Sequence, residues 1–226
     1  METIGNSIKR VDAVAKVTGK AKFPGDFQFA DQLTMKVLFA GRPHAIIHSI
    51  NIEKALAIPG VVTVLTAKDV PNNEYGLSIP DQPVLCGPGS NKEFADRVRF
   101  EGDQVALVVA ENEQIANQAL KAIEVDYEDL PITSTLDEAL SNDAFIIHPD
   151  LGSNVFQHNV VRFGDVEEAF QKCAVIVEKE YRTPVQEHAY LQPEAGVAYM
   201  DNEERITVIV GGQWVHEDQE QIAHAL

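Results

Sequence analysis

The residues best suited to chemistry stand at 211–213, where two glycines are followed by a glutamine. The run 206–210 before them is apolar and rich in β-branched residues, and a polar segment that begins like a helix follows. A strand, a glycine-containing turn and a helix start can hold a ligand at the end of a strand. The neutral amide of Gln213 can donate hydrogen bonds to an oxo or phosphate oxygen without adding charge. Gln213 is therefore the leading candidate for a ligand contact, whereas Trp214 is expected in the core.

Glutamine, glutamate and imidazole groups also gather at 186–188, before an expected strand. Gln186, Glu187 and His188 could line a polar pocket together with Gln213. The alternative is a corner between elements, in which these side chains bond to backbone groups. The residue types fit both interpretations equally.

The segment that follows Trp214 can be compared with a metal-binding pattern. His216 and Glu217 begin like the zinc-protease motif H-E-x-x-H, but position 220 holds glutamate instead of the second histidine. Glu220 and His224 stand four residues apart, which suits metal ligation on a helix. An exposed polar pair is the commoner explanation of that spacing, so no metal ligand is assigned. The chain also has no G-x-G-x-x-G after a strand, no P-loop and no G-x-S-x-G elbow.

The composition is that of a globular protein with a strongly acidic balance. Of 226 residues, 45% are hydrophobic, and 18 Lys and Arg stand against 35 Asp and Glu, a formal net charge of −17. This charge opposes binding to nucleic acid and to anionic membranes, which needs clustered cations. Cys86 and Cys173 belong to no metal or redox motif, so free thiols are expected rather than a disulfide. With no signal peptide and no apolar run of spanning length, we expect a cytoplasmic protein.

Strand and helix patterns divide the chain into two parts. The expected strands of the first part cover 35–40, 44–52, 61–66, 104–110 and 123–127. Residues 111–122 place apolar side chains on one helical face, so 104–127 is expected to form a β-α-β unit whose strands share a sheet through a right-handed crossover. Residues 1–135 are therefore an N-terminal arm and an α+β domain, a mixed sheet with packed helices. The stretch 72–97 has little periodicity and is interpreted as a surface excursion rather than a functional loop.

The second part begins after a candidate linker at 136–160. Asp165 is expected to cap a short helix at 166–170. Extended runs at 174–182, 196–200 and 205–210 then predict strands, the last two joined by a hairpin loop at 201–204. Residues 161–226 therefore start a second, sheet-containing domain, with too little apolar sequence to close a core of its own.

Several segments along the chain occur in a recognisable order. They are RVDAVAKVTGKAKF at 10–23, RPHA at 42–45, FEGDQVALVVA at 100–110, ANQALKAIEVDYEDLP at 116–131, FGDVEEAF at 163–170, QEH at 186–188 with PE at 193–194, and GQ at 212–213. Together they resemble the large, molybdopterin-binding subunit of the xanthine dehydrogenase and aldehyde oxidoreductase family. The loop IPDQPVLC at 79–86 is most similar to the purine-oxidising branch.

The resemblance implies an α/β hammerhead domain up to about residue 130 and the start of a molybdopterin-binding domain from about 140. It implies that Gln213, next to Gly212, lies beside the molybdenum and bonds to one of its oxygen ligands. The implied chemistry is hydroxylation of a purine with water, with electrons leaving through 2Fe–2S and FAD groups on partner subunits. The expected partners are the rest of the molybdopterin domain, the Fe–S and FAD subunits and a small purine or aldehyde substrate, and a homo-oligomer is compatible.

The resemblance also implies that the catalytic glutamate lies beyond position 226. No catalytic residue is therefore assigned in this chain, no bound cofactor is expected on the chain alone, and a truncated or split gene is expected. One alternative is an aldehyde or N-heterocycle (for example nicotinate) oxidoreductase of the same family. Another is a non-catalytic scaffold that binds partner subunits.

Overall fold

A computed structural model of the chain describes residues 4–77, 79–191 and 193–226. The contacts divide these residues into two compact units. The first unit combines residues up to 132 with residues 193–226, and the second comprises residues 133–191. The turn at 211–213 thus belongs to the same unit as the strands of the first 130 residues.

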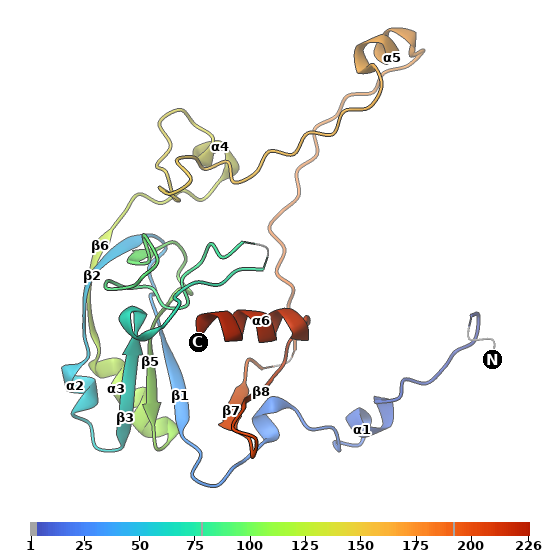
Figure 1. The fold of residues 1–226 in the computed structure, drawn as a ribbon. Coiled ribbons are helices and arrows are strands. Elements are labelled where there is room, and N and C mark those ends of the chain that lie inside the picture. The colour runs from blue at the N-terminus through green and yellow to red at the C-terminus, as the bar shows by residue number, and fades with distance from the viewer. Residues whose placement is uncertain (1–3, 78, 192) are drawn as a thin grey trace. The chain divides into compact units, whose positions relative to one another are not determined.

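The first sheet of the larger unit is built around its most buried strand. The strands are β1 (Thr34–Phe39), β3 (Val61–Thr66) and β5 (Gln104–Ala110). Their order is β1-β5-β3, and both pairings are antiparallel, so β5 lies between the other two (Figure 1). The helix α3 (Glu113–Ala122) begins where the side chain of Asn112 accepts a hydrogen bond from the Ile115 amide (3.0 Å). Its alanine-rich face packs against this sheet, so the predicted helix is confirmed.

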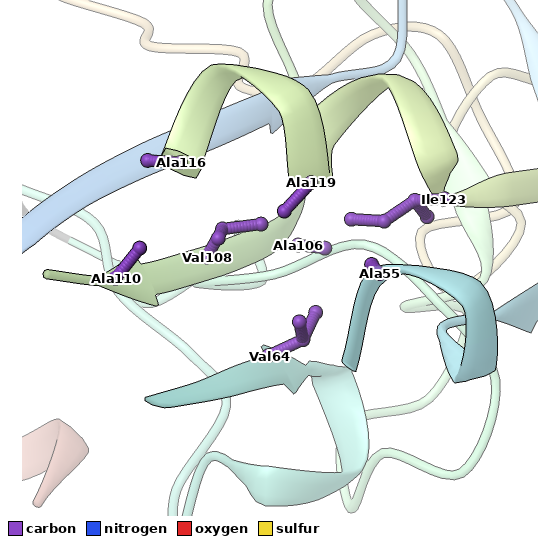
Figure 2. Packing of buried hydrophobic residues seen from close by; sticks show 8 residues of the cluster. All are labelled: Ala55, Val64, Ala106, Val108, Ala110, Ala116, Ala119 and Ile123. Atoms are coloured by element: carbon purple, nitrogen blue, oxygen red, sulfur yellow. The ribbon is translucent and has the colours of Figure 1, made fainter. Parts of the chain in front are cut away.

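The core between α3, β5 and β3 consists of small aliphatic side chains (Figure 2). Its buried members are Ala55, Val64, Ala106, Val108, Ala110, Ala116, Ala119 and Ile123. Alanines on facing elements allow close approach of helix and sheet, and the valines and Ile123 fill the space between them. Such a core loses stability with each methyl group removed.

The alternating burial of β3 gives a direct test of this packing. Val64 is 4% exposed and Val62, two residues earlier, is 55% exposed. Replacing Val64 with alanine is expected to lower the free energy of unfolding by about 2 kcal/mol, because it leaves a cavity in the core. Val62→Ala removes the same atoms from an exposed side chain and should cost less than about 1 kcal/mol. Urea denaturation of both variants measures the difference, and equal losses would contradict the burial.

The second sheet carries a row of ion pairs. Its strands are β2 (Ala45–Asn51), β4 (Arg97–Val98) and β6 (Glu124–Asp129), in the order β4-β2-β6 with antiparallel pairings. Acidic side chains of β6 pair with cations beside β2: Arg42 with Asp129 (3.2 Å) and Lys54 with Glu124. On β2 itself, His48 Nε2 lies 2.8 Å from Glu128 Oε2. Its core is formed by Ala40, Ala45, Ile47, Cys86, Val98 and Val105.

The predicted crossover between 104–110 and 123–127 is wrong. β5 and β6 lie in different sheets. Both edges of β5 are already occupied, by β1 and β3, so β6 has no place beside it. β6 also alternates acidic exposed residues with Val125 and Tyr127, a pattern that suits an edge strand with one solvated face. The predicted α+β class is nevertheless confirmed.

The long loop at 72–97 is anchored through its buried residues. Leu85 is 1% exposed and Cys86 is 2% exposed. Burial, with nearby Asp103 as the second cause, raises the pKa of the Cys86 thiol to about 12, so this thiol stays protonated and unreactive at neutral pH. Asn73 is fully buried, and its side chain forms two hydrogen bonds with the backbone of Leu85. Its Nδ2 donates to the Leu85 carbonyl, and its Oδ1 accepts from the Leu85 amide. The loop is thus part of the folded unit rather than a loose excursion.

The remaining elements are short, apart from the 11-residue helix α6. They are α1 (Ala13–Val17), η1 (Pro24–Asp26), α2 (Glu53–Leu56), η2 (Ala67–Asp69), α4 (Leu136–Ala139), α5 (Val166–Lys172), β7 (Gly196–Met200), β8 (Ile206–Val210) and α6 (Val215–Ala225). Asp165 caps α5 as predicted, since its carboxylate accepts from the Glu168 amide (2.9 Å). The predicted strand at 174–182 is wrong, because no described strand pairs with it. No helix in the described ranges is long and apolar enough to cross a membrane.

Candidate cofactor contact at the hairpin–helix turn

The C-terminal segment forms a hairpin followed by a helix, as the sequence predicts. β7 and β8 pair antiparallel from Gly196–Val210 to Met200–Ile206. The loop between them is closed by the carboxylate of Asp201, which accepts from the amides of Glu203 (2.8 Å) and Arg205 (3.0 Å). After β8 the chain turns through 211–214 into α6 (Figure 1).

Gly212 stands where a side chain would meet the first turn of α6. A Cβ at this position would lie 1.9 Å from Asp218 Oδ2, so any larger residue displaces that carboxylate. The first turn of α6 carries Glu217 and Asp218, which match the positive end of the helix dipole. These carboxylates disfavour an anion at the helix start, and the neutral polar side chain that the turn offers is that of Gln213.

Gln213 presents its amide to solvent. The residue is exposed, and within the described residues its side chain makes no hydrogen bond. An amide in this state retains two donors and an acceptor for a ligand. Trp214 is 56% exposed rather than in the core, because no described element packs over the turn.

A cavity of about 780 Å³ adjoins the turn, between β8 and α6. Ile206, Val208 and Val210 of β8 line one side, and Val215 and Ile222 of α6 line the other. Gly212 borders this cavity, but Gln213 is not among its lining residues. Glu204, His216 and Asp218 also line it, so its walls combine apolar with polar and acidic side chains.

The polar residues at 186–188 belong to the second unit, where they lie exposed and outside any helix or strand. The Glu187 carboxylate accepts from the amide of Ala189 (3.2 Å), a local bond of the kind expected for a corner between elements. The hypothesis of a pocket that they share with Gln213 remains a prediction.

For Glu220 and His224, the described residues show neither a metal site nor a pair between the two side chains. His224 Nε2 lies 3.0 Å from Glu74 Oε1, so its partner is a residue 150 positions away rather than Glu220. Across 4–77, 79–191 and 193–226, no three His, Cys, Asp or Glu side chains are grouped so that they could hold a metal ion. The contact with Glu74 was missed because residues so far apart leave no local pattern in the sequence.

The chain thus combines small antiparallel sheets and packed helices with a hairpin and a glycine-containing turn, and two family models match it. Residues 18–131 match the family described as "Aldehyde oxidase and xanthine dehydrogenase, a/b hammerhead domain". Residues 147–226 match the "Molybdopterin cofactor-binding domain". The chain belongs to the aldehyde oxidase and xanthine dehydrogenase family, which confirms the resemblance seen in its sequence.

Individual relatives cover the chain almost completely. The nicotinate dehydrogenase large molybdopterin subunit of Eubacterium barkeri is 38% identical over 226 residues, which are 100% of this chain and 51% of that protein. A probable xanthine dehydrogenase subunit of Bacillus subtilis (strain 168) is 40% identical over 215 residues, 95% of this chain and 28% of that protein. The solved aldehyde oxidoreductase from Desulfovibrio gigas superposes with a TM-score of 0.81 and 31% identity, over 96% of this chain and 24% of that chain. The chain thus spans about half the length of the first relative and less than a third of the other two.

Proposed function

We propose that this chain is part of the molybdopterin-binding subunit of a hydroxylase that resembles xanthine dehydrogenase, and that Gly212 and Gln213 contact its cofactor. The observation that carries the proposal is the exposed amide of Gln213, which bonds to no described residue, on a two-glycine turn. This turn lies within 147–226, the part of the chain that matches the cofactor-binding family.

The turn fits such a group through its glutamine. Gly212 itself packs against α6, since a Cβ there would lie 1.9 Å from Asp218 Oδ2. Gln213 is neutral, so it can donate to an oxygen of the cofactor without changing the charge of the site. When bound, the molybdenum cofactor supplies the redox chemistry that hydroxylates an electron-poor carbon with water. The role of this chain is to hold and orient the group, and no catalytic residue or metal ligand is assigned to it.

The same proposal divides the chain and names its partners. Residues 1–135 are the arm and hammerhead domain, 136–160 a linker, and 161–226 the beginning of the molybdopterin-binding domain. The partners are the rest of that domain and further chains that carry 2Fe–2S and FAD groups. Both curated relatives are named as subunits, which supports an assembly of several chains. We place the protein in the cytoplasm, where an exposed free thiol such as that of Cys173 stays reduced.

A second candidate is an N-heterocycle hydroxylase that acts on nicotinate. It is favoured by the relative from Eubacterium barkeri, which matches this chain over its whole length and is named for that substrate. Both candidates use the same cofactor and differ in the substrate pocket. Gln213 contacts the cofactor in either case, so it does not distinguish them.

The test is to produce the protein from its native gene context, with its neighbouring genes, in cells supplied with molybdate. About one molybdenum per copy of the chain is expected by elemental analysis. Anaerobic addition of hypoxanthine or xanthine should then bleach the visible absorbance of the Fe–S and flavin groups, whereas bleaching by nicotinate or by an aldehyde alone selects the alternatives. Protein from cells grown without molybdate is the matched control. An assembly that binds no molybdenum and is reduced by none of these substrates would refute the proposed function.

A further inference from the structure

The loop 72–76 contacts residues 221–225 of α6. Here the backbone amide of Asn72 donates to the carbonyl of Ala225 (3.2 Å), and Asn72 Nδ2 donates to the carbonyl of His224 (3.1 Å). One turn earlier, the amide of Gly76 donates to Gln221 Oε1 (3.3 Å). The loop 72–76 therefore donates hydrogen bonds to a helix about 150 residues further along the chain.

The side chain of His224 also contacts this loop. Its Nε2 lies 3.0 Å from Glu74 Oε1 and 2.6 Å from Asn72 Nδ2. Glu74 also pairs with Lys92 (3.4 Å). The hydrogen bond from His224, followed by that from Lys92, lowers the pKa of Glu74 from its ordinary value, so this carboxyl is ionised at neutral pH.

The loop 72–76 is itself attached to the rest of the unit through the side chain of Asn73. Asn73, between the two residues that contact α6, is fully buried. Its Nδ2 donates to the Leu85 carbonyl (2.9 Å) and to Ser90 Oγ (2.8 Å), and its Oδ1 accepts from the Leu85 amide (2.9 Å). The two bonds to Leu85 are buried, so Asn73 fixes the backbone between Asn72 and Glu74.

The hairpin on the other side of the turn has a separate attachment. The rings of Phe29 and Tyr199 lie 4.8 Å apart, centroid to centroid, which joins β7 to the chain just after η1. The turn at 211–214 thus has a hairpin attached to residue 29 before it and a helix attached to the loop 72–76 after it. Both the hairpin before the turn and the helix after it therefore contact residues among the first 132.

We propose that Asn72 and Glu74 are positioning residues, which hold α6 through His224 and so set where the Gly212–Gln213 turn stands. What the turn binds rests on the proposed function, whereas the positioning itself does not. The loop of the hammerhead part would then support the cofactor contact of the following domain without touching the cofactor.

Hydrogen exchange of the α6 amides and the fluorescence of Trp214 test this in the 226-residue chain. Trp214 is the only tryptophan and lies in the turn itself. Glu74→Gln and His224→Ala should each speed exchange in α6 about two- to fivefold, the range for one polar contact between side chains, and red-shift the Trp214 emission. The double variant should show less than the sum of the two single effects, because both changes remove the contact between Glu74 and His224.

Glu220→Gln is the matched control, since it removes the same charge from an exposed position on α6 itself. It should leave both signals unchanged, and exchange in β5 should stay constant in every variant, which shows that the fold is retained. Wild-type exchange in Glu74→Gln, or additive effects in the double variant, would overturn the proposal. Because neither readout needs a cofactor, this result is independent of whether the protein binds molybdenum.

Discussion

Replacing Asn73 with alanine is expected to lower the free energy of unfolding by about 3–5 kcal/mol. The side chain is fully buried and forms three hydrogen bonds, two of them to the amide and carbonyl of Leu85. Leu85 is itself 1% exposed, so water cannot replace the lost partner without opening the loop. A buried backbone group left without a hydrogen bond costs about 1–3 kcal/mol, and alanine leaves two such groups as well as a small cavity.

Urea denaturation followed by circular dichroism measures this loss. Asn202→Ala in the exposed hairpin loop is the matched control and should change the free energy of unfolding by less than about 0.5 kcal/mol. Asn73→Asp keeps the acceptor that Leu85 uses but loses both donors, so it should also be strongly destabilising. Losses below about 1 kcal/mol in both Asn73 variants would mean that the loop is not held by this side chain.

Local patterns in the sequence predict the elements that local forces determine. The helix α3 follows from its apolar face and its Asn112 cap, and the hairpin from two β-branched runs on either side of a polar loop. The Gly212–Gln213 turn follows from the glycines between strand and helix. In each case the residues that decide the structure lie within about a dozen positions of one another, so their periodicity and turn chemistry are visible in the sequence.

Contacts between segments that are distant in the chain could not be predicted from the sequence. β6 leaves the sheet of β5 because β1 and β3 already occupy both edges of that strand, which no property of residues 104–129 reveals. In the same way, the spacing of Glu220 and His224 suggests a pair on one helix, whereas His224 contacts Glu74. The segment 174–182 has a strand pattern but no described partner, and a strand requires a partner to bond its backbone.

Replacing Gln213 with alanine in the assembled, molybdenum-loaded protein is expected to lower turnover about 10–100-fold, the usual effect of removing a hydrogen bond that orients a metal's ligands. The stability of the chain should change little, because the side chain is exposed and bonds to no described residue. The loss of turnover would therefore arise at the proposed cofactor contact and not from unfolding. A loss of unfolding free energy beyond about 0.5 kcal/mol would contradict this interpretation.

The measurement is steady-state turnover together with the molybdenum content of each preparation. Gln118→Ala, which truncates an exposed glutamine on α3, is the matched control and should keep both values. Reduced turnover at full molybdenum content would mean that Gln213 orients a cofactor that other residues retain, whereas loss of the metal would mean that Gln213 also helps to hold it. Unchanged turnover and unchanged metal content in Gln213→Ala would remove Gln213 from the site while leaving the family assignment intact, because that assignment rests on the matches over 18–131 and 147–226.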